Sequence, residues 1–217
     1  AELVWCDVAQ LLRANVAPQI AGNFFTVNLR NVRSAFEQVP WVRSAQVRRE
    51  YPRTLRVQLQ EHRAVAHWGP ESGSSMVNSE GEVFESNGVD AELDDLPRLM
   101  GPVGTSEQVL AMEQALLPVF EPLGLELSGL ELSTRGGWRA SFDGDAAIEL
   151  GSGTPPEVVQ RTRNFAETLT RVAAQFGRRA DALESADLRH TGGYALRLRG
   201  VSTVATQGTP RTARTHN

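Results

Sequence analysis

The sequence has no lysine, only one cysteine and no long apolar run. No stretch approaches the roughly 18 consecutive apolar residues that a membrane-spanning helix needs. Because Cys6 has no second cysteine to pair with, an intramolecular disulfide is excluded, and packing must hold the fold. All 22 basic residues are arginine, a bias typical of GC-rich coding sequence. Every cation is therefore a planar guanidinium that can make forked hydrogen bonds.

The balance of charge is slightly acidic, with a net charge of -4 over 217 residues. A protein that binds nucleic acid needs a concentrated positive surface, so nucleic acid is not expected as a partner. Hydrophobic residues make up 41% of the chain, which is enough for one large domain or two small ones. This composition excludes a disordered or fibrous chain.

The N-terminal third has the pattern of a small α+β unit. Apolar residues recur at three- and four-residue steps over 8–20 and again over 29–39, which predicts two helices, the second capped by Asn28. Strict alternation over 41–48 and 54–60 then predicts a hairpin with one buried face and one arginine-rich face.

The rest of the chain predicts a larger, mostly antiparallel sheet with two helices. The fold class expected for the whole chain is therefore α+β. In chain order we expect a connector over 63–70, a hairpin over 76–84, an acidic loop over 87–95, a helix over 105–120, a strand meander over 125–150, a helix over 154–176, and a final hairpin over 182–201.

No residue pattern points to catalysis, a metal or a cofactor. His62 and His67 are five residues apart, a spacing that suits neither one face of a helix nor one face of a strand. No Gly-x-Ser-x-Gly motif occurs, and the turn 151–153 before a helix is a weak phosphate signal without a following lysine. We therefore expect no enzyme activity and no small-molecule substrate, and a cell-wall enzyme stays a less favoured hypothesis.

Binding through a strand edge is the function that the pattern favours. The final strand, over residues 194–199, is the last of the fold and is expected to have a free edge that an incoming strand can join. Arg189 and Arg135 are candidates for charge-assisted hydrogen bonds to acidic residues of a partner.

Several ordered motifs in both halves resemble the FtsQ family of bacterial cell-division proteins, including its POTRA domain. The motifs are GNFFTVNL (22–29), VPWVRSAQVRR (39–49), VQLQEH (57–62), VNSEGEVF (77–84), LPRL (96–99), Trp138 before a strand, LG (150–151) and DLR (187–189). The resemblance covers about residues 7–200.

The resemblance implies a POTRA domain over 1–65, an FtsQ-type β domain over 66–202 and a disordered tail over 203–217. It also implies a single-pass inner-membrane protein whose periplasmic region lies at the division septum. Its partners are expected to be FtsB, FtsL and other divisome proteins, and its role to be a scaffold that helps control septal peptidoglycan synthesis. A cytoplasmic tail, a transmembrane helix and a first POTRA strand would precede Ala1.

Carried over to this sequence, the resemblance makes Arg189 the leading contact for FtsB, which would add a strand to the β domain. His190 stands where the family commonly has tyrosine, and Gly192, Tyr194 and Leu196 fall on the turn and strand that would be extended. Arg135 lies in the region that supplies another basic contact. The alternative is a POTRA module of outer-membrane protein assembly or secretion, which would pair with unfolded substrate strands.

Overall fold

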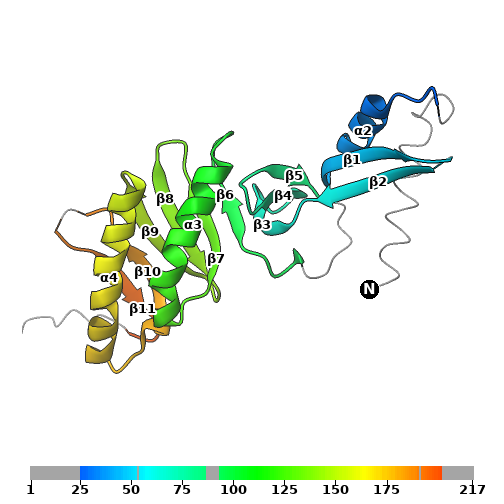
Figure 1. Ribbon diagram of the computed structural model, residues 1–217. Coiled ribbons are helices and arrows are strands. Elements are labelled where there is room, and N and C mark those ends of the chain that lie inside the picture. The colour runs from blue at the N-terminus through cyan, green and yellow to red at the C-terminus, as the bar shows by residue number, and fades with distance from the viewer. Residues whose placement is uncertain (1–24, 53, 87–92, 191, 202–217) are drawn as a thin grey trace, which may run out of the picture.

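The structure, a computed structural model, describes residues 25–52, 54–86, 93–190 and 192–201. Over these residues a helix and a two-stranded hairpin form an N-terminal unit, and a nine-stranded sheet with two long helices forms the rest (Figure 1). The strand order of the large sheet is β11-β10-β9-β8-β7-β6-β3-β4-β5. The α+β class predicted from the sequence is confirmed.

Helix α2 (Leu29–Glu37) begins where the sequence predicts. Asn28 precedes it in an extended conformation, and its side-chain oxygen accepts a hydrogen bond from the backbone N–H of Arg30 at 2.9 Å. This bond satisfies one of the N–H groups that a helix start leaves unpaired. Val32 and Ala35 are buried on the face that packs against the hairpin.

The hairpin consists of β1 (Val42–Glu50) and β2 (Thr54–Glu61), paired antiparallel. A register shift between Val42 and Ser44 interrupts the alternation, so Val42 and Ala45 are both buried although strict alternation places them on opposite faces. Beyond the shift the pattern holds, and exposed Arg48 lies directly opposite exposed Arg56.

The segment predicted as a connector over 63–70 contains a strand, and that prediction is wrong. β3 (Ala64–Trp68) pairs antiparallel with β4 and parallel with β6, in the interior of the large sheet. The strand is short and four of its five residues are apolar, with only Ala66 buried, so its sequence carries no apolar–polar alternation. The domain boundary predicted between residues 65 and 66 falls inside this strand.

The other strands of the large sheet follow the predicted hairpins and meander. Three neighbouring pairs, β3 with β6, β6 with β7 and β9 with β10, are parallel, and the others are antiparallel. The strands are β4 (Ser75–Asn78), β5 (Val83–Glu85), β6 (Arg98–Met100), β7 (Leu127–Leu132), β8 (Gly137–Phe142), β9 (Ala146–Ser152), β10 (Leu183–Asp187) and β11 (Ala195–Leu198).

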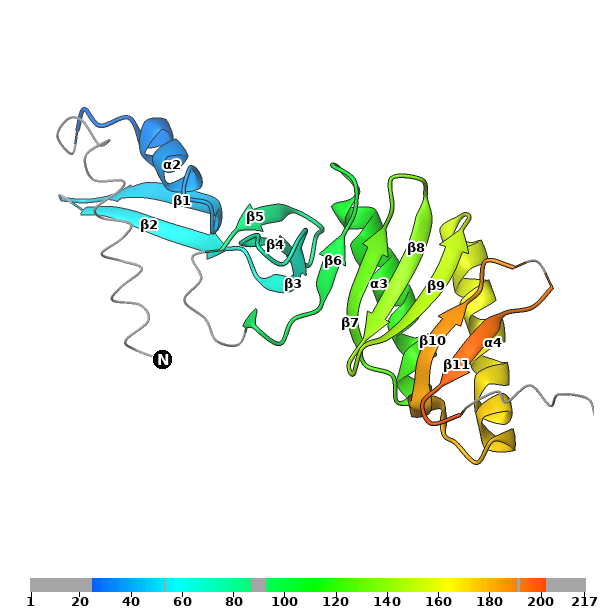
Figure 2. The same cartoon turned by 180° about the vertical axis from the view of Figure 1, so that it is seen from behind.

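Two helices, α3 (Ser106–Phe120) and α4 (Pro155–Gln175), lie side by side on one face of the sheet, and Figure 2 shows the opposite face without a helix over it. A short 3-10 turn, η3 (Glu121–Leu123), follows α3 directly, and a second, η4 (Ala180–Ala182), lies between the end of α4 and β10. The main core lies between helices and sheet. Its largest fully buried side chains include Trp138, Phe120, Phe165, Leu116, Ile148 and Leu169.

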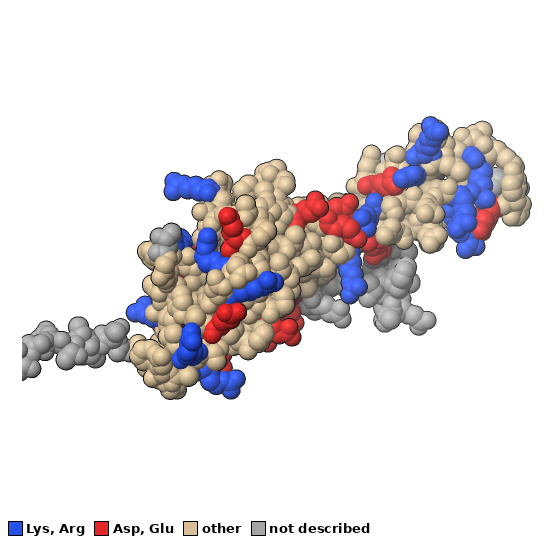
Figure 3. Space-filling model, turned by 60° about the vertical axis from the view of Figure 1, so that its left-hand side comes forward, with Lys and Arg blue, Asp and Glu red and all other residues tan. Residues whose placement is uncertain are grey.

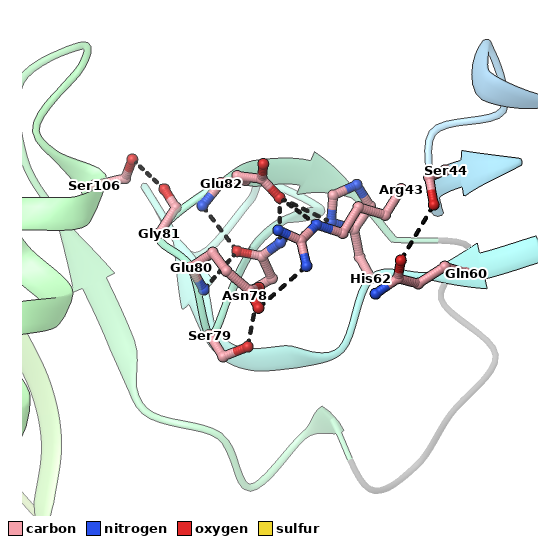
Figure 4. A network of polar contacts seen from close by, with 10 residues as sticks. All are labelled: Arg43, Ser44, Gln60, His62, Asn78, Ser79, Glu80, Gly81, Glu82 and Ser106. Carbon is pink, nitrogen blue, oxygen red and sulfur yellow. Dashed lines mark hydrogen bonds and ion pairs between the residues drawn. The ribbon is translucent and has the colours of Figure 1, made fainter. Parts of the chain in front are cut away.

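A polar network joins the N-terminal unit to the large sheet (Figure 4). Arg43 of β1 forms ion pairs with Glu80 at 3.1 Å and Glu82 at 3.0 Å, both on the turn between β4 and β5. Buried Asn78 accepts hydrogen bonds from the backbone N–H groups of both glutamates and donates one to the Glu82 carboxylate at 2.7 Å. The bond that Asn78 donates to this carboxylate and the charge of Arg43 lower the pKa of Glu82.

The same turn is fixed to helix α3. Gly81 has a φ of 81°, and a β-carbon built on it would lie 2.7 Å from the Cα of Glu107, so only glycine fits. The hydroxyl of Ser106 donates to the carbonyl of Gly81 at 2.7 Å. The network therefore connects β1 through the β4–β5 turn to the start of α3.

Some predictions fall outside the described residues. These are the helix over 8–20, Cys6, the tail over 203–217 and most of the acidic loop over 87–95. Among the residues that the structure describes, no helix combines the length and the hydropathy needed to cross a lipid bilayer.

Candidate functional site

β11 is the terminal strand of the large sheet and has a strand neighbour on one side only within the described residues. It pairs antiparallel with β10, so that Ala195 lies opposite Asp187 and Leu196 opposite Ala186. Ala195 and Arg197 are exposed, and Leu198 is buried in the core. A terminal strand presents unpaired backbone N–H and C=O groups, which is the geometry that strand addition needs.

Arg189 follows β10 and is held by Asp187. Its Nε donates to one carboxylate oxygen at 2.9 Å and its Nη2 to the other at 2.6 Å, and its backbone N–H donates to the first oxygen at 3.0 Å. These bonds lower the pKa of Asp187 to about 2. The side chain of Arg189 is 61% exposed, so the guanidinium is fixed in orientation while remaining open to solvent.

Tyr194, just before β11, is fixed by helix α4. Its hydroxyl lies 2.7 Å from the hydroxyl of Thr168, with which it shares a hydrogen bond. Its ring meets the ring of Phe165 edge-on, with centroids 4.9 Å apart and planes at 89°. Tyr194 thus connects the start of the terminal strand to the helix behind it.

Two hollows lie at the end of the sheet where β9 and β10 end and β11 begins, and no residue of β11 itself lines either of them. The tyrosine hollow, of about 440 Å³, is lined by Phe165, Thr168, Leu188, His190, Gly192 and Tyr194. The arginine hollow, of about 500 Å³, is lined by Arg135, Arg139, Glu131, Glu149 and Trp138. Arg161 and Arg189 line both hollows, which makes them the residues that connect the two.

The arginine hollow carries more positive than negative charge. Arg139 lies directly across from Glu131 on β7 and from Glu149 on β9, and it forms an ion pair with Glu149 at 3.4 Å. Arg135, in the exposed turn between β7 and β8, has no such carboxylate partner among the described residues. Elsewhere on this part of the molecule basic and acidic side chains are interspersed (Figure 3).

The structure brings most of the sequence-predicted site residues together. Arg189, His190, Gly192 and Tyr194 line one hollow, and Arg135 joins Arg189 in the other although 54 positions separate them in the sequence. Leu196 lines neither hollow, because β11 turns its side chain toward the core, where it is half-buried.

Sequence reasoning missed Arg161, Phe165 and Thr168, all on α4. Their spacing of four and three residues places them on one face of the helix. This pattern predicts that Phe165 is buried in the core, but it does not predict a surface site. The glycine-rich turn at 151–153 is visible in the sequence. The hydrogen bonds that Arg161 donates to the carbonyls of Leu150 and Ser152 are not, because they depend on how α4 packs against this turn.

The two central histidines have structural roles. His62 stacks on Phe84 with ring centroids 4.5 Å apart, its Nδ1 lies 2.9 Å from the side-chain nitrogen of Asn78, and burial lowers its pKa. His67 bonds through Nε2 to the carbonyl of Leu93 at 2.8 Å. Among the described residues, no group of three or more potential ligands is gathered for a metal ion.

Comparison with known proteins assigns both parts of the chain. Residues 66–189 match the family model for the C-terminal region of cell division protein FtsQ/DivIB, and residues 9–62 match the FtsQ-type POTRA domain. The first match alone spans more than half of the chain.

The chain belongs to the FtsQ/DivIB family.

Relatives cover most of the chain at similar identity. Cell division protein FtsQ of Thiomonas arsenitoxydans is 37% identical over 88% of this chain and 70% of the relative. FtsQ of Burkholderia pseudomallei is 36% identical over 89% and 75%, and FtsQ of Bordetella pertussis is 36% identical over 86% and 71%. The family resemblance found in the sequence motifs is therefore confirmed.

The family fixes the coarse function. This is a cell division protein with an N-terminal POTRA domain followed by a β domain, and FtsQ/DivIB is not a known enzyme family. The β11 edge and the two hollows all lie in the β domain. They are separate from the POTRA hairpin and from the network around Arg43.

Proposed function

We propose that this chain is the periplasmic part of a division scaffold that binds FtsB and FtsL and links early and late division proteins. It is held at the inner membrane by a single transmembrane helix and helps to control septal peptidoglycan synthesis. Residues 1–65 act as the POTRA module, residues 66–202 as the partner-binding β domain, and residues 203–217 as a tail. This proposal rests on the family and on the geometry of one sheet edge.

The observation that carries the proposal is the terminal position of β11, which begins at the same end of the sheet as the two hollows. A segment of FtsB in extended conformation can add to β11 through backbone hydrogen bonds, and these bonds provide affinity without reading sequence. Side chains provide the specificity. Where β11 begins, the partner meets Tyr194, His190 and Arg189; Arg135, on the β7–β8 turn, is met only by a part of the partner that extends across the ends of β10 and β9.

Arg189 supplies the charge contact of this interface. Its fork on Asp187 fixes the guanidinium without covering it, so less side-chain entropy is lost when a partner carboxylate binds. A charge-assisted hydrogen bond of this kind contributes roughly 1.5 to 3 kcal/mol where it is desolvated. His190 and Tyr194 add ring surface beside it.

Arg189→Glu tests the proposal. The substitution reverses the charge next to the edge and places two carboxylates side by side, so we expect the affinity for the periplasmic fragment of FtsB to fall by more than tenfold. Arg179→Glu is the matched control, because Arg179 is also an exposed arginine paired with an aspartate two positions away, at 3.6 Å, but it precedes β10 and lines neither hollow.

Isothermal titration calorimetry with the purified chain measures both affinities, and circular dichroism checks that each variant is folded. A folded wild-type chain that binds neither FtsB nor FtsL would overturn the proposed function. Equal losses for Arg189→Glu and Arg179→Glu would count against the β11 edge as the binding place.

A further inference from the structure

Arg161 of α4 lies between the two hollows and is anchored to the loop after β9. Its guanidinium donates to the carbonyl of Leu150 through Nη1 and to the carbonyl of Ser152 at 3.1 Å through Nη2. A guanidinium has five N–H donors, so these two bonds leave others directed elsewhere. The Gly-Ser-Gly turn thus presents carbonyl oxygens to an arginine, the opposite of the anion-binding geometry considered from the sequence.

Gly151 lies beside both Arg161 and Arg189. It is buried, has a φ of 83°, and lies between the two side chains. A β-carbon built on it would come 2.8 Å from Nη1 of Arg161 and 3.3 Å from Cγ of Arg189. Any other residue would therefore force one of the arginines away, in addition to the backbone strain at this φ.

The two arginines differ in how their charge is compensated. Arg189 has Asp187 as an ion-pair partner, whereas Arg161 is bound to neutral carbonyls and forms no ion pair with a described carboxylate. Its nearby acidic neighbour on the helix, Glu157, bonds instead to the backbone N–H of Thr154 at 2.8 Å. This bond and, less strongly, the charge of Arg161 lower the pKa of Glu157, but Arg161 and Glu157 form no ion pair, so the border between the hollows has a cation held by neutral carbonyls.

We propose that Arg161 is a second charge contact for the partner, and that Arg161 and Arg189, which flank Gly151, together receive one acidic side chain of the segment that adds to β11. This inference rests on the proposed function and deepens it, since it states that the hollows bind an acidic side chain of the partner. Gly151 is a positioning residue, because it acts through the two arginines.

The test compares two arginines on the same helix. Arg161→Gln removes the charge, and we expect about tenfold weaker binding of the periplasmic FtsB fragment together with a smaller dependence of affinity on salt. Arg163→Gln is the matched control, because Arg163 is exposed on α4 and lines neither hollow. Arg161→Lys keeps the charge and should retain most of the salt dependence.

Gly151→Ala should weaken binding to a similar extent, and the loss in the Gly151→Ala/Arg161→Gln double variant should be no larger than in either single variant. Each acidic residue of the FtsB fragment is then replaced in turn by its amide. One of these replacements should weaken binding of the fragment to the wild-type chain. The same replacement should not weaken binding to the Arg161→Gln variant any further.

The outcomes separate the two proposals. If wild-type chain binds FtsB and folded Arg161→Gln binds equally well with the same salt dependence, the role of Arg161 is refuted while the proposed function stands. If no acidic residue of the fragment is coupled to Arg161, the carboxylate chemistry is refuted. Absence of FtsB binding by the wild-type chain would refute the proposed function itself.

Discussion

At the scale of single residues, Asp187 fixes the orientation of the Arg189 guanidinium. Its carboxylate accepts three hydrogen bonds from Arg189, two from the guanidinium and one from the backbone. Hydrogen bonds to the charged form of a carboxyl favour that form, which is why the pKa of Asp187 falls to about 2. The interaction therefore orients the arginine over the whole physiological pH range.

A titration checks this contact. Because the folded-state pKa of Asp187 lies below its ordinary value of 3.8, the unfolded state binds the proton more readily. The contact thus contributes stability above pH 3.8 and loses it as the pH falls toward 2. NMR titration of the side-chain carboxyl should show this pKa, and Arg189→Gln should raise it back toward the ordinary value. Arg179→Gln should leave it unchanged.

Residues of the site differ in how far the sequence predicts them. Arg189, His190 and Gly192 follow one another in the chain, so a single motif locates them together. Arg161 contributes from a different element, and nothing in its local pattern separates it from Arg163, two positions later on the same helix. Only the packing of α4 against the loop after β9 distinguishes the two.

At the scale of elements, α4 supports the terminal strand through Tyr194. We expect Tyr194→Phe to lower the free energy of unfolding by about 1 kcal/mol, because it removes the hydrogen bond between the hydroxyls of Tyr194 and Thr168. Thr168→Val should have a similar effect, and the double variant should lose less than the two single losses combined. Urea unfolding measures all three, with exposed Thr170→Val on the same helix as the control.

Additive losses in this cycle would contradict a direct link between α4 and the start of β11. The link also bears on function, because a terminal strand that is loosely held at one end offers a less regular edge to a partner. Tyr194→Phe leaves Arg189 and every other charge unchanged. Weaker FtsB binding by this variant would therefore measure the effect of a loosely held strand alone.

Elements with a clear period were predicted well from the sequence, and pairings between distant strands were not. α2 and α4 begin after the residues expected to precede them, Asn28 and Thr154, since capping is a local interaction. β3 was missed because it is short and almost wholly apolar, so no apolar–polar alternation marks it. The parallel pairs β6–β7 and β9–β10 join strands separated by helices, and no local signal reports them.

At the scale of the whole molecule, Arg43 connects the POTRA hairpin to the β domain. Each ion pair is partly exposed and is worth less than about 1 kcal/mol, so Arg43→Gln should change overall stability little. The effect should be geometric instead. With the pairs to Glu80 and Glu82 removed, we expect the distance between the two domains to vary more widely.

Electron spin resonance distance measurements test this on a Cys6→Ser background, with labels at Gln58→Cys on the hairpin and Arg163→Cys on α4. Arg43→Gln should broaden the distance distribution. Arg56→Gln is the control, since Arg56 pairs with Glu50 within the hairpin. Equal distributions in wild type and Arg43→Gln would show that the network does not hold the domains in place.

The order of strands in the large sheet also determines when the β11 edge can form during synthesis of the chain. β10 and β11, within residues 183–198, are the last two strands at one end of the sheet, and β10 pairs in parallel with β9, from which the whole of α4 separates it in the sequence. Until α4 has emerged and docked, β9 is the temporary end of the sheet. The edge proposed for the partner's strand therefore forms only after nearly all of the described chain has been synthesised, so we expect assembly to follow completion of the domain.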